Sequence, residues 1–226
     1  MSRRPDPQFV TFDMYGTLTD FPVGAAAEKT IEAISSPGQR DVFRRRFAAY
    51  QLDESMGDWR PYDELIARAF ERACRSAGIP FRPADPAAVF DQIPTWGPHP
   101  DVPGPLARLA RLAARYPLVI LSNASDLHAS RNAALLGAPL HAVYTAEQAR
   151  AYKPRLGAFE YLYAQLGCRP EDTLHVSASP RYDLQSATDL GVRETVYLNR
   201  GYEPSAPHCH AYEVTTLTGV AELLGV

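Results

Sequence analysis

The segment Phe9-Val-Thr-Phe-Asp-Met-Tyr-Gly-Thr-Leu18 decides how this chain folds. It opens with aromatic and β-branched residues and continues into Gly16-Thr17, so residues 9–14 are predicted to form a buried strand that enters a loop. Asp13 stands near the end of this strand, where a buried carboxylate is costly unless it is paired or hydrogen-bonded. Asp13 is therefore interpreted either as the cap of a turn or helix, or as a carboxylate nucleophile used in covalent catalysis.

Four later apolar runs predict further strands, at residues 117–123, 141–146, 173–178 and 194–199. Apolar residues with helical spacing lie between these runs, as in the two sets Leu106, Leu109, Leu112 and Phe159, Leu162, Leu166. Strands that alternate with helices are typical of βαβ units. The chain is therefore predicted to have an α/β fold with a doubly wound, Rossmann-like parallel sheet.

Residues 20–97 interrupt this alternation, because they contain no convincing strand run. Residues 41–54 and 62–78 have the spacing of amphipathic helices, and Gly78 suits a helix C-terminal cap. We therefore expect an α/β core domain formed by residues 1–19 and 98–226, with residues 20–97 inserted after the first strand as a helical cap domain. An insert there is placed to cover the carboxyl end of that strand, where open α/β sheets bind ligands.

The composition excludes several classes of protein. The chain has 226 residues and a formal net charge of -3, with no basic face that would favour a nucleic-acid partner. Its 3 cysteines are an odd number without CxxC spacing, which argues against a disulfide framework or a zinc cluster and fits a reducing compartment. With neither a signal peptide nor a membrane-spanning run, the sequence predicts a cytoplasmic protein with no membrane partner.

Polar side chains lie at or beyond the carboxyl ends of three of the predicted later strands. They are Ser122, Asn123, Lys153, Ser177, Ser179 and Asp183. Each taken alone has an ordinary interpretation as a turn former, a surface lysine or a helix cap. The carboxyl ends of parallel strands meet at one edge of a sheet, so together with Asp13 these groups predict an active site there. His175, inside the fourth strand, is interpreted as a packed and hydrogen-bonded histidine.

Four motifs of the chain, FDMYGTL (12–18), LSN (121–123), YKP (152–154) and VSASPRYD (176–183), resemble those of haloacid dehalogenase-like hydrolases. The resemblance spans nearly the whole chain and includes the helical cap. Phosphatases of that superfamily carry a second aspartate two residues after the nucleophile, and it protonates the leaving alkoxide. Tyr15 stands at that position here, and a halide leaves without needing a proton. The form Asp-x-Tyr-Gly-Thr-Leu is similar to that of type II L-2-haloacid dehalogenases.

The resemblance implies the hydrolytic dehalogenation of a short 2-haloalkanoic acid through an ester on Asp13. In that reaction Lys153 would keep Asp13 ionised, Thr17 and Ser122 would orient its carboxylate, and Asp183 would position Lys153 or help to activate water. Ala178 stands where the magnesium-dependent relatives have the first acid of a metal-binding pair. Neither a metal nor another cofactor is therefore expected.

Further residues are expected to contact the substrate. In the cap, Arg44 matches a family arginine that would meet a carboxylate or a halide, and Tyr50 lies further along the same helix. Asn123 would line the halide side of the site. The remaining expected contacts are Tyr15, Ser177, Ser179 and Phe159. Phe159 replaces a usual tyrosine and Ser179 a usual asparagine, so both bear on what the site recognises.

Three alternative functions stay open at this level. They are a magnesium-dependent phosphatase on the same fold, a hydrolase of another small activated acid that uses the same ester mechanism, and a non-catalytic binding protein. The expected partner is a small halogenated carboxylic acid, and the resemblance also implies that the chain can pair as a homodimer.

Overall fold

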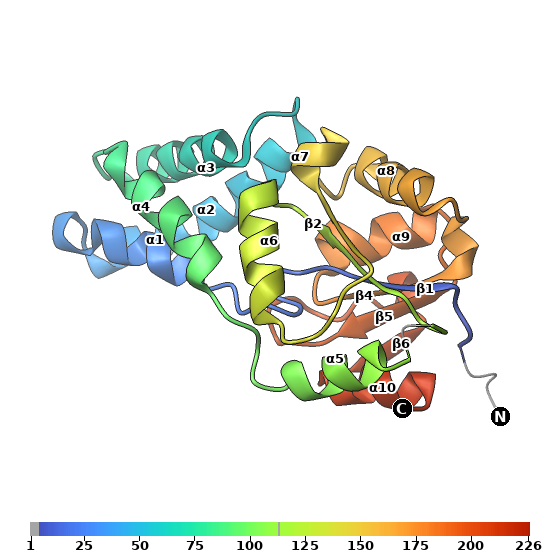
Figure 1. Cartoon of the computed structure of the whole chain (residues 1–226). Coiled ribbons are helices and arrows are strands. Elements are labelled where there is room, and N and C mark those ends of the chain that lie inside the picture. Colours follow the sequence, from blue (N-terminus) through green and yellow to red (C-terminus); the bar gives the residue numbers. More distant parts are fainter. Residues whose placement is uncertain (1–4, 113) are drawn as a thin grey trace. The chain divides into compact units, whose positions relative to one another are not determined.

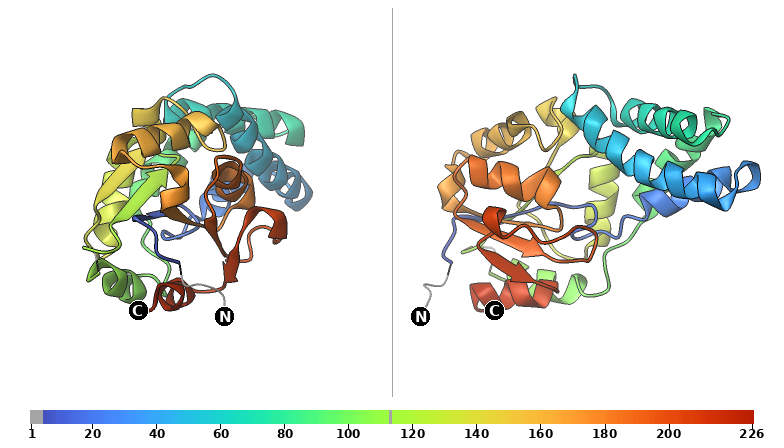
Figure 2. Two further views of the ribbon diagram at one scale, coloured as in Figure 1. Left: turned by 90° about the vertical axis from the view of Figure 1, so that its right-hand side faces the viewer. Right: turned by 180° about the vertical axis from the view of Figure 1, so that it is seen from behind.

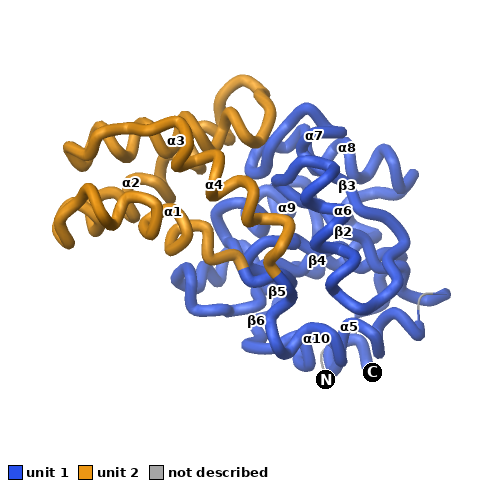
Figure 3. The backbone as a smooth tube through the Cα atoms, turned by 60° about the vertical axis from the view of Figure 1, so that its left-hand side comes forward, with its two compact units in different colours: residues 1–20, 97–226 blue, residues 21–96 orange. Residues whose placement is uncertain are grey.

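The computed structural model describes residues 5–112 and 114–226. The chain divides into two compact units, which Figure 3 shows in different colours. Unit 1 comprises Met1–Asp20 and Gly97–Val226, and unit 2 comprises Phe21–Trp96. These bounds lie one residue away from the predicted junctions at 19/20 and 97/98.

Unit 1 is built on a six-stranded parallel sheet with the strand order β3-β2-β1-β4-β5-β6 (Figure 1). The strands are β1 (Phe9–Phe12), β2 (Leu118–Ser122), β3 (Ala142–Thr145), β4 (Thr173–Ser177), β5 (Glu194–Leu198) and β6 (Tyr212–Val214). The predicted fold class is confirmed. The sequence did not predict β6, because three residues are too few to show an alternating pattern.

Helices cover both faces of this sheet, and Figure 2 shows them from two further sides. They are α5 (Pro103–Ala110), α6 (Asp126–Leu135), α7 (Ala146–Ala149), α8 (Leu156–Leu166), α9 (Gln185–Asp189) and α10 (Leu217–Leu224), and a π-helix, η4 (Pro180–Leu184), precedes α9. The predicted helical spacing fails at Leu112, which lies beyond the end of α5 and is 37% exposed. Pro117 and the strand β2 follow too soon for α5 to continue through it.

The two faces of the sheet have separate apolar cores, because successive side chains of a strand point to opposite faces. On one face, Val10 and Phe12 of β1 and Ile120 of β2 pack with α5, α6 and α10. On the other face, Val119 and Leu121 of β2 pack with α8 and α9. This alternation decides which polar side chains near the strand ends can meet.

Unit 2 is helical in its described residues. Its helices are α1 (Val23–Ile31), α2 (Pro37–Met56), α3 (Tyr62–Ala77) and α4 (Ala84–Gln92), with short 3-10 turns at Glu32–Ile34 and Ile93–Thr95. Ser36 caps α2 through the backbone N–H of Gln39. Gly78 ends α3 with a φ of 64°, a conformation that glycine adopts at little cost. None of the described helices of either unit has the length and apolar character needed to cross a membrane.

An aromatic cluster of Phe43, Phe47 and Phe70 forms the centre of unit 2, and none of the three side chains is exposed. The rings of Phe43 and Phe70 meet edge to face with centroids 4.9 Å apart, and those of Phe43 and Phe47 stack at 5.5 Å. Such ring pairs add to the free energy gained by burying their apolar surface. The cluster joins α2 to α3.

Phe70→Ala is predicted to lower the free energy of unfolding by about 3–5 kcal/mol, because it leaves a cavity between α2 and α3. Met56→Ala, on the half-exposed end of α2, serves as control and should change it by less than about 0.5 kcal/mol. Urea unfolding followed by circular dichroism measures both. Equal effects of the two substitutions would show that the aromatic cluster does not stabilise this unit.

Candidate active site

Asp13 and Thr17 meet because the chain turns back directly after β1. The backbone N–H groups of Leu18 and Thr19 both donate to Met14 O, and Gly16, with a φ of 82°, permits the turn. Thr17 Oγ1 then donates to Asp13 Oδ2 at 2.6 Å and accepts the backbone N–H of Ala178 at 2.9 Å. Thr17 therefore fixes the orientation of the Asp13 carboxylate and ties it to the end of β4.

The Lys153 ammonium is buried and uses all three of its donors. Nζ lies 2.7 Å from Asp13 Oδ1, 2.7 Å from Asp183 Oδ1 and 2.8 Å from Leu121 O. A lysine ammonium has three N–H donors and no acceptor, so every donor has a partner here. Lys153 thus joins two carboxylates that lie far apart in the sequence.

Asn123 holds the backbone of Lys153. Its Nδ2 donates to Lys153 O at 2.8 Å, and its Oδ1 accepts from Lys153 N at 2.8 Å. Both ends of the amide are therefore used to anchor the segment that carries the ammonium. This anchoring role differs from the predicted one, in which Asn123 lines the halide side of the site.

The hydrogen bond expected from Ser122 to Asp13 is not made. Ser122 is 1% exposed, and its Oγ has no hydrogen-bond partner among the described residues. The alternation of the strands explains the difference, because Ser122 shares the face of Leu118 and Ile120, whereas Asp13 follows Phe12 and therefore points to the opposite face. Thr17 and Lys153, without Ser122, therefore orient Asp13.

Asp183 is the second carboxylate of the site, and it lies in η4. Its Oδ1 accepts from Lys153 Nζ and lies 3.1 Å from His175 Nε2. The other ring nitrogen, His175 Nδ1, lies 2.8 Å from Thr11 Oγ1. A continuous polar chain therefore runs from Thr11 through His175, Asp183 and Lys153 to Asp13.

The loop after β4 is held by its own hydrogen bonds. Ser177 Oγ accepts the backbone N–H of Ser179, and Ser179 Oγ accepts that of Tyr182. Ser179 Oγ also donates to Glu203 Oε1 at 2.8 Å, while Glu203 Oε2 accepts the backbone N–H of Arg181. Nothing in the sequence near residue 203 pointed to this carboxylate, which fixes the loop from a distant segment.

Phe159 packs against His175, whereas Tyr15 is hydrogen-bonded to Asn132. Phe159, expected near the substrate, has no exposed surface and meets the His175 ring edge to face at 5.4 Å. Tyr15 OH donates to Asn132 Oδ1 at 2.7 Å. Burial, and secondarily the Asp13 carboxylate, raise the pKa of the Tyr15 phenol well above its usual value. Tyr15 is therefore a poor proton donor.

Arg44 and Tyr50 lie in unit 2. Arg44 Nη2 pairs with Asp41 at 2.9 Å, and the guanidinium also lies 3.6 Å from Glu28. Tyr50 OH lies 2.9 Å from Ser76 Oγ, and the Arg72 guanidinium stacks 4.1 Å from the centre of the Tyr50 ring. That Arg44 and Tyr50 contact substrate stays a prediction.

The two carboxylates differ in their proton affinity and in their access to solvent. Burial raises the pKa of Asp13, and the charge of Asp183 raises it further, although Lys153 and the hydrogen bond from Thr17 act in the opposite direction. Burial also disfavours the charged form of Asp183, but Lys153 and the hydrogen bond from His175 outweigh it and lower its pKa. The Asp13 side chain is 10% exposed and that of Asp183 only 1%. Asp13 is thus the carboxylate that a small molecule can reach.

The residues that could hold a metal are few. In residues 5–112 and 114–226, no group of three or more His, Cys, Asp or Glu side chains is arranged to bind an ion.

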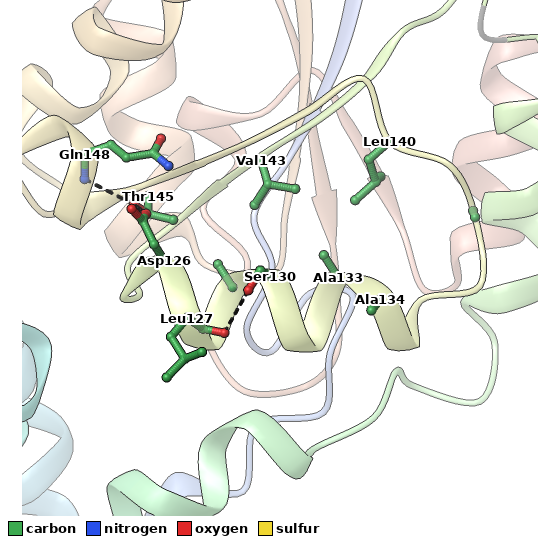
Figure 4. A pocket seen from close by; sticks show the side chains of 11 residues that line it. Asp126, Leu127, Ser130, Ala133, Ala134, Leu140, Val143, Thr145 and Gln148 are labelled. Atoms are coloured by element: carbon green, nitrogen blue, oxygen red, sulfur yellow. Dashed lines mark hydrogen bonds between the residues drawn. The ribbon is translucent and has the colours of Figure 1, made fainter.

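A cavity of about 670 Å³ lies elsewhere in unit 1, between α6 and β3 (Figure 4). None of Asp13, Thr17, Lys153 and Asp183 lines it. Its lining residues are Asp126, Leu127, Ala129, Ser130, Ala133, Ala134, Ala138, Leu140, Val143, Thr145 and Gln148.

The parallel α/β sheet thus places an oriented carboxylate beside a buried lysine at the edge where open α/β sheets bind ligands. The family model for haloacid dehalogenase-like hydrolases matches residues 8–191. The chain belongs to the haloacid dehalogenase-like hydrolase family, which confirms the resemblance and makes the protein a hydrolase.

Similar proteins within the family bear dehalogenase names. The chain is 27% identical over 222 residues to (S)-2-haloacid dehalogenase 1 of Pseudomonas sp. (strain CBS-3), covering 94% of each chain. It is 29% identical over 200 residues to haloacetate dehalogenase H-2 of Moraxella sp. (strain B), covering 84% of this chain and 85% of the relative. The L-2-haloacid dehalogenase from Xanthobacter autotrophicus, solved with chloropropionic acid covalently bound, shares the fold: the TM-score is 0.74 at 21% identity, and the match covers 96% of this chain and 98% of that one.

The charge of Asp183 is predicted to control the protonation of Asp13. In the resting protein Asp13 should titrate above its usual value of 3.8. Asp183→Asn removes a like charge and should move this midpoint to lower pH. Carbon-13 NMR of the aspartate carboxyls measures it, with Asp13 assigned through Asp13→Asn.

Asp172→Asn is the matched control, because Asp172 precedes β4 and pairs with Arg169 at the opposite end of that strand. This change should leave the Asp13 midpoint in place. A midpoint that stays fixed or rises in Asp183→Asn would contradict the assigned coupling.

Proposed function

We propose that this hydrolase removes halide from a short 2-haloalkanoic acid through an ester intermediate on Asp13, without a metal ion. The observation that carries the proposal is the state of Asp13: Lys153 and Thr17 bind its two oxygens at 2.7 Å and 2.6 Å, and part of its side chain is still exposed. A carboxylate that is oriented and paired with a cation, yet reachable, suits nucleophilic attack.

The reaction has two steps. An Asp13 carboxylate oxygen attacks the halogen-bearing carbon in line, the new C–O bond forms, and the C–halogen bond breaks with its electron pair leaving on the halide. Water then attacks the carbonyl carbon of the ester, and the acyl–oxygen bond breaks. The hydroxyacid leaves, Asp13 is restored as a carboxylate, and one proton passes to solvent. Lys153 stabilises the carboxylate before and after each cycle.

The residue at position 15 favours halide over phosphate as the group that leaves. An alkoxide leaving group needs a general acid close to the nucleophile. The Tyr15 phenol, whose raised pKa keeps it protonated and whose O–H is bound to Asn132, is poorly suited to donate. A halide leaves as a weak base and needs no proton.

The position of Lys153 supports a reaction without a metal ion. Its ammonium lies 2.7 Å from each of the two site carboxylates and offsets part of the negative charge that would attract a cation. Hard cations such as Mg²⁺ are bound by oxygen ligands, usually with several carboxylates or waters. Ala178 contributes no ligand where a further acid would be needed.

The names of similar proteins support the substrate class. The Pseudomonas relative is called a 2-haloacid dehalogenase and the Moraxella relative a haloacetate dehalogenase, and each matches most of this chain. We therefore expect a halogenated carboxylic acid of two or three carbons as substrate. Arg44 is the side chain that we expect to supply a cation to it.

Isotope labelling is predicted to locate the ester. After a single turnover in heavy-oxygen water, the peptide that contains Asp13 should gain one heavy oxygen, and the first hydroxyacid released should carry none. Mass spectrometry of the protein and of the product measures both, with Asp13→Asn as the control that releases no halide. Label found only in the product would show direct attack by water and overturn the ester mechanism.

Treatment with a chelator is predicted to leave the rate of halide release unchanged. An ion chromatograph or a halide electrode follows release from chloro-, bromo- and fluoroacetate and from 2-chloropropionate, before and after exhaustive dialysis against EDTA. A loss of activity that Mg²⁺ restores, or rapid turnover of an aryl phosphate, would favour the magnesium-dependent phosphatase instead. No halide release from any of these acids would point to another activated acid.

A further inference from the structure

His175 lies one side chain away from the reacting groups and is hydrogen-bonded at both ring nitrogens. Nε2 lies 3.1 Å from Asp183 Oδ1, and Nδ1 lies 2.8 Å from Thr11 Oγ1. The ring has no exposed surface, so substrate cannot touch it. The hydrogen bond of His175 to Asp183 is therefore its polar link to the groups around Asp13.

The partners of the ring decide where its proton lies. An ionised Asp183 can only accept, so the hydrogen between Nε2 and Oδ1 belongs to the histidine. Thr11 Oγ1 donates to Leu174 O at 3.2 Å and also lies 2.8 Å from His175 Nδ1. The contact with the ionised Asp183 therefore requires a proton on Nε2 of the ring.

Asp183 depends on this donor because Lys153 is its other hydrogen-bond donor among the described residues. Its Oδ1 accepts from Lys153 and from His175, while its Oδ2 is buried and has no hydrogen-bond partner among the described residues. Without the Nε2–H donor, a buried anion would be held by Lys153 alone. The carboxylate would then be free to turn about its last torsion, and the ammonium shared with Asp13 would lose its fixed direction.

We propose that His175 is a positioning residue for the reaction at Asp13: its Nε2–H holds the Asp183 carboxylate, which in turn aims the Lys153 ammonium at the nucleophile. The inference rests on the proposed ester function for its kinetic consequence, but the hydrogen bond itself belongs to the resting protein. Phe159, edge to face with the ring at 5.4 Å, and Thr11 set the orientation of the imidazole.

A pair of amide substitutions separates this role from simple packing. In His175→Gln the side-chain nitrogen can take the place of Nε2 and donate to Asp183, whereas in His175→Asn the amide reaches only the place of Nδ1, next to Thr11. Both lose the ring contact with Phe159. We expect kcat for halide release to fall about tenfold or more in His175→Asn, with KM changed less than about twofold, and to stay within about threefold of the parent in His175→Gln.

Equal losses of kcat in the two amide variants would show that only packing matters, and unchanged kcat in His175→Asn would show that the bond is dispensable. Either result overturns the proposal. If neither amide variant folds, His175→Phe keeps the ring volume and the contact with Phe159 but has no donor. A folded His175→Phe with low kcat and unchanged KM supports the proposal, and one with the kcat of the parent overturns it.

Nitrogen-15 NMR of the resting protein tests the bond without any substrate. The His175 ring, identified by the signal that disappears in His175→Gln, should show a proton on Nε2. A proton on Nδ1 alone overturns the proposal even if the protein is an active dehalogenase. The absence of halide release by the parent protein, with the Nε2 proton present, would instead count against the proposed function.

Discussion

The buried Lys153 ammonium between two carboxylates is the constraint on which this structure depends. An unpaired charge in the interior of a protein is very costly, so the ammonium requires its three acceptors and the carboxylates require their donors. These partners come from the end of β1, from β2 and from η4. The parallel sheet brings all three to one edge, and Asn123 fixes the lysine backbone there. The parallel sheet is therefore what brings the charged groups of the site together.

The same arrangement gives Asp13 and Asp183, two chemically identical side chains, different proton affinities and different exposure to solvent. One ammonium cannot neutralise two carboxylates, and the local donors favour the charged form of Asp183 over that of Asp13. Groups whose environments push their pKa values apart can take different roles in catalysis. Asp183 is enclosed, which suits a group that orients others, and Asp13 keeps the exposed surface that a nucleophile requires.

The sequence predicted the fold and the meeting of Asp13, Thr17, Lys153 and Asp183, because each lies in the segment that follows the carboxyl end of a strand and parallel strands end at one edge. It predicted less well how individual side chains point. The Ser122 hydroxyl turns to the other face of the sheet, since the two-residue period of β2 places it there. Glu203 and His175 gain their partners through tertiary contacts, and no local pattern marks such contacts. The three residues of β6 are too short for any periodicity.

The buried chain from Thr11 to Asp13 also bears on what kind of leaving group the site can serve. Every proton in it is held between a donor and an acceptor inside the protein, at distances of 2.7 to 3.1 Å. The phenol nearest the nucleophile in sequence is likewise bound, to Asn132. Among the described residues, the groups that contact Asp13 offer charge and orientation, and the phenol of Tyr15 is a poor acid. Chemistry that expels a weakly basic anion needs only the first two, which is why the electrostatics and the residue at position 15 favour the same class of reaction.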